Sequence, residues 1–479
     1  LYTSSRPGRP WNPRVKFFDR LLAVPVGDSR VVKPMKVTFV RPNMSDSRSW
    51  DAMTPLVFAI LAGLTPRGVQ VVLYDERLEP IPFDDPTDLV AITVETYTAR
   101  RAYQIASQYR KRGVRVVMGG YHATFLPEEA LNYADSVVVG DAEGLWEQVV
   151  CDARAGRLQR IYRQATQPSL QGSKPDHGIF RGKRYAPITL VQYGRGCRYA
   201  CDFCSIHAFY GFNLRQRPVR EVVAEIEALN RKHVFLVDDN IFVDVAKAEE
   251  LFQALIPLKI HWSCQVSIDV ARNDRLLELM EKSGCLTAVV GFESLDERNL
   301  QQMKKRWNLK HDDYATSIRR LQDHGIMIYG TFVFGYDHDT VDSFDVSVEF
   351  ALRSNFYLAN FNPLTPTPGA QLYDRLRAEG RLVHDRWWLA PDFRYGQATF
   401  HPRGMTAEQL TQGCYRARSA FNTYGAIFKR TLAPKTNCRS PYRLGVYLAS
   451  NLISRREIHR KQGLRLGDES RLEPLLEAS

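Results

Sequence analysis

Three cysteines lie close together in the stretch GRGCRYACDFCS, residues 194–205. They are Cys197, Cys201 and Cys204, three of the eight cysteines in a chain of 479 residues. Random placement of the cysteines would give a CxxxCxxC spacing in about one chain of 450, so we interpret the spacing as functional. Because thiolates bind zinc and iron–sulfur clusters, the spacing predicts a metal centre.

Two kinds of metal centre are compatible with this loop. Structural zinc prefers four Cys or three Cys and one His, and His207 could join the three cysteines in such a set. Zinc ligands usually come in separated pairs, however, whereas these four would share one short loop. A four-iron cluster normally takes four thiolates, so three would leave one iron open to a small molecule. The other five cysteines have no paired spacing and are interpreted as core thiols.

The first part of the chain alternates between short apolar runs and helical patterns. We expect strands at 36–42, 69–75, 88–94, 114–120 and 135–141, and helices at 52–66 and 98–113. Val/Ile-rich runs separated by helices are typical of a parallel sheet that is covered on both faces. Ligands of such sheets bind beyond the carboxyl ends of the strands, where Gly119, Gly120 and Gly140 lie.

A second alternating block runs from Pro187 to about Asn362. Its expected strands are 188–194, 233–239, 260–266, 286–292, 326–335 and 356–361, and its expected helices are 218–230, 244–256, 272–283, 311–324 and 339–353. Six such units predict a complete or partial parallel barrel, with catalytic groups at the carboxyl ends of its strands. The cysteine loop follows the first of these strands.

The sequence therefore predicts an α/β protein with five parts. They are an N-terminal extension (1–34), a Rossmann-like parallel sheet (35–155), a polar linker (156–186), a partial (β/α)6 barrel (187–370) and a mostly helical C-terminal domain (371–479). The first residues show no signal-peptide pattern, and no apolar run is long enough to span a bilayer. We therefore expect a cytoplasmic protein.

The net charge of +12 is unevenly distributed. Between Pro402 and Gly463, only Glu408 and Glu457 oppose the basic residues. The basic residues of this segment are Arg403, Arg416, Arg418, Lys429, Arg430, Lys435, Arg439, Arg443, Arg455, Arg456, Arg460 and Lys461. Such a surface attracts phosphates, nucleic acid or anionic lipid, or it is a solvated helical face.

The stretch CRYACDFC resembles the CxxxCxΦC signature of radical S-adenosylmethionine (SAM) enzymes, with Phe203 as the aromatic residue. In that family the open iron of a [4Fe–4S] cluster binds SAM, and cleavage of SAM yields a 5′-deoxyadenosyl radical. The resemblance implies that residues 187–370 are a radical SAM barrel. It implies SAM contacts at Phe203, Asp238, Asp239, Ser267, Glu293 and Thr331. Helix caps and turns are the alternative roles for the polar residues of this set.

The stretches GGYHAT (119–124) and VGDAEG (139–144) resemble the cobalamin-binding domain that is fused to many radical SAM enzymes. The resemblance implies cobalamin contacts at Thr93, Glu95, Thr96, Gly119, Gly120, His122, Thr124, Gly140, Asp141 and Glu143. A dinucleotide is not expected, because no GxGxxG follows the first strand. The DxHxxG motif of methionine-synthase-type domains is also missing there, so no His at that position binds cobalt. His122 is interpreted as a residue that hydrogen-bonds the ligand tail or the backbone.

The resemblance implies a cobalamin-dependent radical SAM methyltransferase. Its cofactors would be a [4Fe–4S] cluster, SAM and cobalamin, and an external one-electron reductant of the flavodoxin or ferredoxin type would serve it. The substrate would be a small-molecule or lipid-like compound with an unactivated carbon, and the basic C-terminal region would provide peripheral membrane contact. A radical cyclase or rearrangement enzyme with the same cofactors is the alternative, and a zinc-bearing nucleic-acid-binding protein is the alternative of another class. Nucleic acid is not expected, because charge is the only signature for it.

Overall fold

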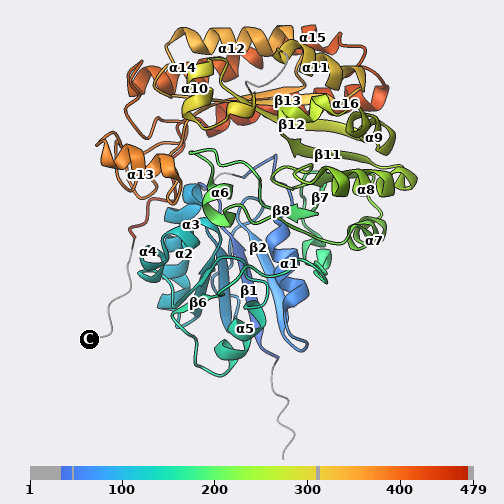
Figure 1. Cartoon of the computed structure of the whole chain (residues 1–479). Helices are drawn as coiled ribbons and strands as arrows, with labels where there is room; N and C mark the ends of the chain where they lie inside the picture. The colour runs from blue at the N-terminus through green and yellow to red at the C-terminus, as the bar shows by residue number, and fades with distance from the viewer. Residues whose placement is uncertain (1–33, 46–47, 309–312, 473–479) are drawn as a thin grey trace, which may run out of the picture. The chain divides into compact units, whose positions relative to one another are not determined.

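The computed structural model describes residues 34–45, 48–308 and 313–472. From Met35 onward, these residues form one compact unit built on two parallel six-stranded sheets (Figure 1). The predicted α/β class, with a Rossmann-like sheet, a partial barrel and a mostly helical C-terminal region, is confirmed. Apart from Pro34, the expected N-terminal extension lies outside the described residues.

The first sheet has the strand order β2-β1-β3-β4-β5-β6. In chain order its strands are β1 (Lys36–Arg41), β2 (Gln70–Asp75), β3 (Leu89–Thr93), β4 (Arg115–Gly119), β5 (Ser136–Val139) and β6 (Ile161–Arg163). Its helices are α1 (Leu56–Leu64), α2 (Ala99–Lys111), α3 (Tyr121–Phe125), α4 (Pro127–Leu131) and α5 (Trp146–Arg154).

Both faces of the first sheet are covered by helices, and strand β4 shows how the sequence achieves this. Val116 and Met118 pack in the same cluster as Tyr103 of α2, whereas Val117 packs in the cluster that holds α1 and Trp146 of α5. Because successive strand residues point to opposite faces, a run without polar positions is suited to a sheet that is buried on both sides.

Strand β6 corrects the expectation of a polar linker at 156–186. Residues Ile161–Arg163 pair with β5 in parallel and add a sixth strand to the sheet. Tyr162 is buried, and its hydroxyl donates to Asp152 at 3.0 Å. Only three residues form the strand, so the sequence shows no apolar run that would distinguish it from a linker.

The second sheet is the partial barrel, with the order β14-β13-β12-β11-β10-β7. In chain order its strands are β7 (Thr189–Val191), β10 (His233–Leu236), β11 (His261–Val266), β12 (Cys285–Glu293), β13 (Met327–Phe334) and β14 (Leu358–Pro363). Its helices are α6 (Ser205–Tyr210), α7 (Val219–Leu229), α8 (Val245–Leu255), α9 (Asp274–Ser283), α10 (Glu297–Gln302), α11 (Tyr314–Asp323) and α12 (Asp342–Arg353). Strands β7 and β14 are the two edges, so the barrel is open between them.

The C-terminal region packs against both sheets. Its helices are α13 (Gln371–Ala378), α14 (Ala407–Phe421), α15 (Tyr424–Thr431) and α16 (Pro441–Lys461). Buried Arg430 of α15 donates to the carbonyl oxygens of Phe356 and Tyr357, where β14 begins. On the other side, the indole of Trp388 donates to Glu129 of α4 at 2.9 Å. Among the helices that the structure describes, none is both long and apolar enough to cross a bilayer.

Candidate cofactor site

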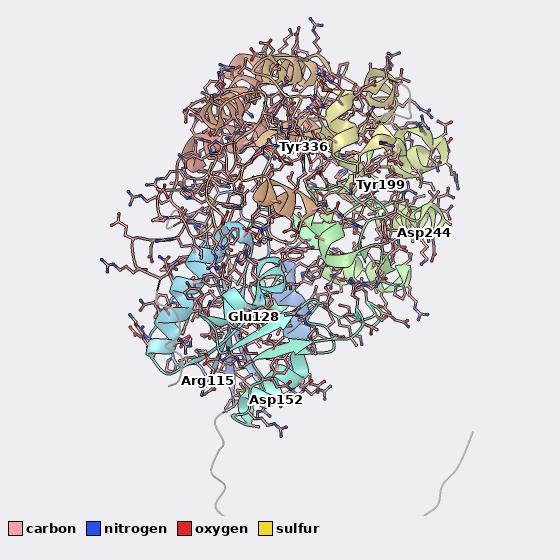
Figure 2. All side chains as sticks on the ribbon, turned by 60° about the vertical axis from the view of Figure 1, so that its left-hand side comes forward. Arg115, Glu128, Asp152, Tyr199, Asp244 and Tyr336 are labelled. Atoms are coloured by element: carbon pink, nitrogen blue, oxygen red, sulfur yellow. The ribbon has the colours of Figure 1, made fainter. Side chains whose placement is uncertain are left out.

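The carboxyl ends of the first sheet face the barrel. Arg115 begins β4, and Figure 2 shows it at the end of the molecule away from Tyr199 of the cysteine loop and Tyr336 beyond β13. A cavity of about 300 Å³ opens at the carboxyl ends of β3, β4 and β5 and is also lined by α1. Its barrel side is formed by Gln192, Arg195, Phe209, Tyr210 and Val237. One cavity therefore reaches from the first sheet to the segments on both sides of the three cysteines.

The cysteine loop begins directly after β7. Gly194 and Arg195 form a short antiparallel ladder, β8 (Gly194–Arg195) with β9 (Arg215–Gln216), and Cys204 directly precedes α6. Gly196 has φ +95°, and a Cβ on it would clash with the carbonyl oxygen of Asn213. Only glycine suits that turn, which brings the three cysteines to the barrel mouth.

The three thiols are free and partly exposed. Burial raises the pKa of Cys197 to about 11 and that of Cys201 to about 12. Metal ligands must be deprotonated, so a bound cation rather than the surrounding protein has to stabilise these thiolates. A nucleophilic cysteine needs a lowered pKa, which is the opposite of the shift at these two thiols.

The two metal centres that the sequence left open make different demands on the spacing of their ligands. A single ion draws its ligands to one point, and no three His, Cys, Asp or Glu side chains converge in that way within the described ranges. Each thiolate of a four-iron cluster binds a different iron, so its thiolates stand further apart. Burial is the main cause of the raised pKa of Cys201, and the charges of Cys204 and Cys197 add to it, so the three thiols are near neighbours.

The carboxylates that follow β10 hold the cysteine loop. Asp238 accepts hydrogen bonds from the backbone N–H groups of Tyr193 and Gly194, and Asp239 accepts one from Gly196 at 2.8 Å. Burial raises the pKa of Asp238 to about 7. Both oxygens of Asp238 accept backbone hydrogen bonds, and its expected contact with SAM stays a prediction. Asp239 uses only one oxygen for hydrogen bonds among the described residues.

The remaining expected SAM contacts lie along neighbouring strands. Glu293 ends β12 with φ +63° and pairs with Lys305 at 2.8 Å. The charge of Glu293 contributes to the raised pKa of Cys201, which places this carboxylate near the cysteine loop. Thr331 lies within β13, opposite Gly291. Lys305 was not expected, because nothing in its sequence context indicates that it reaches back to β12.

Two further expected SAM contacts already have protein partners. Ser267 accepts a hydrogen bond from the amide of Asn240 at 2.9 Å, so it joins the ends of β10 and β11. Phe203 packs against the barrel core. Both residues lie near the barrel mouth, as the sequence predicts. The hydrogen bond of Ser267, however, is to another residue of the chain.

Most of the expected cobalamin contacts line the cavity. They are Thr93, Glu95, Gly119, Gly120, Gly140, Asp141 and Glu143. Gly120 has φ +96°, and a Cβ on it would lie 2.8 Å from the carbonyl oxygen of Val94. The backbone is therefore bare where the cavity meets the strand ends, and a large ligand can approach it closely.

Three of the expected cobalamin contacts do not line the cavity. His122 is fully buried, and its Nε2 lies 3.1 Å from Glu129. Its other ring nitrogen faces Thr96 at 3.4 Å. Thr124 accepts the N–H of Gly140 at 3.0 Å and so shapes the loop from behind. The imidazole of His122 is enclosed by Tyr103 of α2 and by Trp388, and its contact with cobalamin stays a prediction.

Two arginines that the sequence did not identify join the two halves of the site. Arg195, directly before the turn at Gly196, pairs with Asp141 at 2.8 Å and with Glu143 at 2.6 Å. Arg215 of β9 pairs with Asp141 at 2.7 Å. All four side chains are largely buried. The loop after β5 and the cysteine loop are thus connected by ion pairs at the cavity wall.

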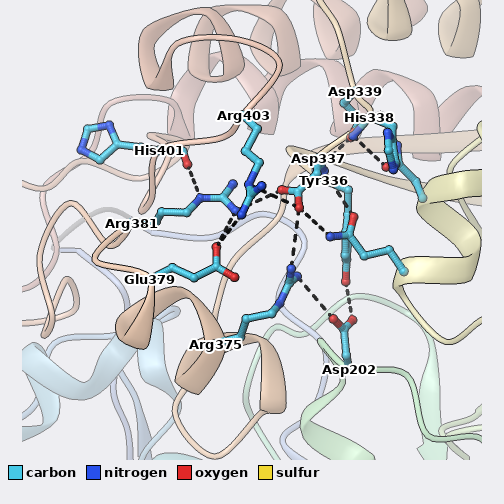
Figure 3. A network of polar contacts seen from close by, with 12 residues as sticks. Asp202, Tyr336, Asp337, His338, Asp339, Arg375, Glu379, Arg381, His401 and Arg403 are labelled. Carbon is cyan, nitrogen blue, oxygen red and sulfur yellow. Dashed lines mark hydrogen bonds and ion pairs between the residues drawn. The ribbon is translucent and has the colours of Figure 1, made fainter.

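A second polar network connects the cysteine loop to the barrel and the C-terminal region (Figure 3). Asp202, between two of the cysteines, accepts the hydroxyl of Tyr336 and pairs with Arg375 of α13 at 3.5 Å. Next to it, Asp337 pairs with Arg381 at 3.0 Å. The loop is therefore supported from β13 and α13 as well as from β10.

Tyrosines gather where β3 faces β13 and β14. Tyr97 hydrogen-bonds Thr365 at 3.0 Å and meets Tyr395 with ring centroids 5.6 Å apart. Tyr329 of β13 lies near the ring of Tyr395. Burial is the main cause of the raised pKa of Tyr329, and the charges of Tyr357 and then Tyr395 add to it. The side chains of Tyr97, Tyr329 and Tyr395 are only partly covered.

Comparison with known proteins agrees with this arrangement. Residues 191–351 match the family model of the Radical SAM superfamily. The bacteriochlorophyllide d C-12(1)-methyltransferase of Chlorobaculum tepidum is 29% identical over 82% of this chain and 89% of its own length. The hopanoid C-2 methylase of Rhodopseudomonas palustris is 25% identical over 72% of this chain and 68% of its own length. The anaerobic magnesium-protoporphyrin IX monomethyl ester cyclase of Rubrivivax gelatinosus is 26% identical over 71% of this chain and 70% of its own length.

A solved structure shares the two-sheet architecture. It is the radical SAM methyltransferase TsrM from Kitasatospora setae with cobalamin and a [4Fe–4S] cluster bound, at a TM-score of 0.60 and 16% identity over 79% of this chain and 81% of TsrM. Residues 191–351 are therefore similar to a radical SAM domain, and most of the chain shares the fold of TsrM.

Proposed function

We propose that this chain is a cobalamin-dependent radical SAM methyltransferase that adds a methyl group to an unactivated carbon. The observation that carries the proposal is the cavity that runs from the glycine-lined ends of β4 and β5 to the cysteine loop. A cobalamin at the strand ends and a cluster on the loop would meet there. When bound, the cluster with SAM supplies a hydrogen-abstracting radical, and cobalamin supplies the methyl group.

The chain's own residues would position these groups. We propose that Cys197, Cys201 and Cys204 hold the cluster, and that Asp239 and Glu293 face the polar end of SAM. Carboxylates suit an ammonium group, and Glu293 is held in place by its ion pair with Lys305. The seven cavity-lining residues named above would contact cobalamin. We also propose the corresponding division of the chain into residues 35–155, extended by β6, and residues 187–370.

We propose that the substrate is a large, mainly apolar ring compound. The half-buried tyrosines Tyr97, Tyr329 and Tyr395 offer flat apolar faces and hydroxyl groups between the first sheet and the barrel. Two relatives are named for substrates of this kind, a bacteriochlorophyllide and a magnesium-protoporphyrin ester. Their ring shape supports the proposal that a flat molecule stacks on these tyrosines.

The proposal includes partners outside the chain. The cluster needs electrons, and we propose an external one-electron reductant of the flavodoxin or ferredoxin type and a cytoplasmic location. We also propose that the basic C-terminal region makes peripheral membrane contact. An apolar substrate is most concentrated at a membrane, which would suit such contact.

Metal analysis tests the cofactors directly. After anaerobic purification and reconstitution, we expect iron, sulfide and cobalt in the wild-type protein. Cys201→Ala should lower bound iron at least about tenfold and leave cobalt in place, because the cobalamin residues lie on another sheet. Cys438→Ala is the matched control and should keep all three. Wild-type protein with iron but without cobalt would remove cobalamin from the proposal and keep the radical SAM domain.

A radical cyclase or rearrangement enzyme is the second candidate, favoured by the relative that is a cyclase. Product mass separates the two functions. With a bacteriochlorophyllide as substrate, methylation raises the mass by one methylene unit, whereas rearrangement leaves the mass unchanged. With SAM that carries a deuterated methyl group, only methylation transfers the label.

A further inference from the structure

Helix α15 presents a row of large apolar side chains to solvent. Tyr424 and Phe428 are 67% and 69% exposed, and Leu432, directly after the helix, is 70% exposed. Their spacing of four residues puts them on one face. Single exposed apolar residues are ordinary, but an uncovered row of this kind marks an interaction surface.

Helix α16 packs beside α15 and extends the row. The hydroxyl of Tyr447 donates to the carbonyl oxygen of Ile427 at 2.7 Å, and the guanidinium of Arg455 lies 4.4 Å from the ring centroid of Tyr424. On α16 itself, Leu448 and Leu452 are 37% and 48% exposed and lie one turn apart. The two helices therefore form one surface, which we call the α15–α16 surface.

The charged side chains that α15 and α16 expose are positive. Between Glu408 and Asp468 the only acidic residue is Glu457, which is buried and pairs with Arg460 at 2.7 Å. Exposed Lys429 directly follows Phe428, and exposed Arg456 lies over the ring of Trp50. Apolar side chains thus stand among cations, with no exposed carboxylate from the same helices.

We propose that the α15–α16 surface docks on an anionic membrane. Tyr and Phe side chains at this exposure enter the headgroup region with little reorganisation of the protein. Each cation near an anionic leaflet adds about 1 kcal/mol of attraction. The inference deepens the membrane contact proposed above by naming its residues, and it does not depend on the methyltransferase activity.

Charge and position favour a membrane over other occupants. A second copy docking through the same surface would bring two positive faces together, which costs free energy. An acidic electron donor would match the charge, but it has to approach the cysteine loop. In Figure 1, α15 lies at the upper edge beside α12, whereas the loop leads into α6 beside the first sheet. A donor on α15 would be on the wrong side of the barrel.

Vesicle sedimentation tests the proposal with the full chain. The vesicles are phosphatidylcholine alone, or phosphatidylcholine with about 30% phosphatidylglycerol. We expect binding to the anionic vesicles only, weakened by salt. The double variant Phe428→Ser/Leu432→Ser and the charge variant Lys429→Glu/Arg456→Glu should each bind at least about tenfold less. Both replace exposed side chains, so folding is preserved, which circular dichroism checks.

Matched controls replace equally exposed residues elsewhere. Phe212→Ser, on the turn after α6, is the apolar control, at 68% exposure, and Arg154→Glu on α5 is the charge control. Both should bind like the wild type. No binding of the wild type to anionic vesicles, or equal binding of the double variant, overturns the proposal. A wild-type dimer that the double variant dissociates, without vesicle binding, overturns it in favour of a second copy.

Discussion

The ion pair between Glu293 and Lys305 is buried beside the cysteine loop. Burial opposes the charge of Lys305, but Glu293 outweighs it and raises the pKa of Lys305. The ammonium also donates to the carbonyl oxygen of Gly291 at 2.6 Å, so its hydrogen bonds end on β12. A buried pair of this kind contributes little net stability, yet removing one partner leaves an unpaired buried charge.

We expect Lys305→Met to destabilise the protein by about 3–5 kcal/mol, because Glu293 then remains buried without its partner. The melting temperature of the cluster-free protein should fall by several degrees. The double variant Glu293→Gln/Lys305→Met should recover most of the loss. Lys282→Met is the control, since its exposed pair with Glu278 contributes at most about 1 kcal/mol. Equal melting temperatures of the single and double variants would contradict this account.

Arg195 connects two segments of the site, the loop after β5 and the cysteine loop. Arg195→Met leaves Asp141 with Arg215 and leaves Glu143 without its guanidinium. We expect cobalt content after reconstitution to fall about tenfold or more, since both carboxylates line the cavity. Iron content should stay close to wild type, because the cysteines are unchanged.

Arg198→Met is the matched control for this experiment. Arg198 lies three residues further along the same loop but pairs with Asp269, and it does not line the cavity. Its cobalt content should equal that of the wild type. Loss of iron together with cobalt in Arg195→Met would instead show that the arginine holds the cysteine loop and not the cobalamin side.

Strands and helices could be predicted from the sequence where a whole run of residues is buried in the same kind of environment. The strand runs around Val117 and Val289 are mostly apolar on both faces, which favours buried parallel strands. Three-residue β6 carries no such run. In the site, the cysteine spacing and the glycines after β4 and β5 were visible locally. Arg195, Arg215 and Lys305 were not, because their partners lie far away in sequence and only the fold brings them together.

The amino ends of β10 and β11 predict a pH dependence of stability. His233 and His261 are opposite each other across the two strands, and Tyr442 of α16 stacks on His261 at 4.4 Å. Burial lowers the pKa of His233 to about 4, and burial with the charge of Arg443 lowers that of His261. The folded protein therefore keeps both imidazoles neutral, whereas the unfolded chain protonates them below about pH 6.5.

Stability should consequently be lost as the pH falls from about 7 to 5, since only the unfolded state takes up these protons. His233→Gln removes one such group, and its loss of stability over this range should be smaller by about 1–2 kcal/mol. Urea unfolding of the cluster-free protein at several pH values measures the difference. His401→Gln, with an exposed imidazole, should behave like the wild type. A wild-type slope in His233→Gln would show that the imidazole is already charged in the folded protein.

In the molecule as a whole, the C-terminal region connects the first sheet to the barrel. Trp388 donates to Glu129 of α4 at 2.9 Å, and the N–H of Gly467 donates to the carbonyl oxygen of Met44 at 2.8 Å. Elsewhere the same region is anchored in the barrel, for example through the contacts of Arg430 with the start of β14. We expect the two walls of the cavity to keep their relative positions only while the C-terminal region stays attached to both the first sheet and the barrel.

We expect Trp388→Phe to weaken the attachment to the first sheet selectively. Phenylalanine keeps an aromatic ring next to His122 but loses the N–H donor to a buried carboxylate, at a cost of about 1.5–3 kcal/mol. Hydrogen exchange followed by mass spectrometry should therefore become faster in α4 and in residues 386–393, while α8 of the barrel stays unchanged.

Trp387→Phe is the matched control, because the indole of Trp387 donates to the neutral carbonyl oxygen of Pro366 at 3.1 Å. Its loss should cost only about 1 kcal/mol and should leave exchange in α4 unchanged. If Trp388→Phe accelerates exchange equally in α4 and α8, the two sheets open as one cooperative unit. The hydrogen bond to Glu129 would then stabilise the whole fold, and cobalamin and cluster walls would separate only on global unfolding.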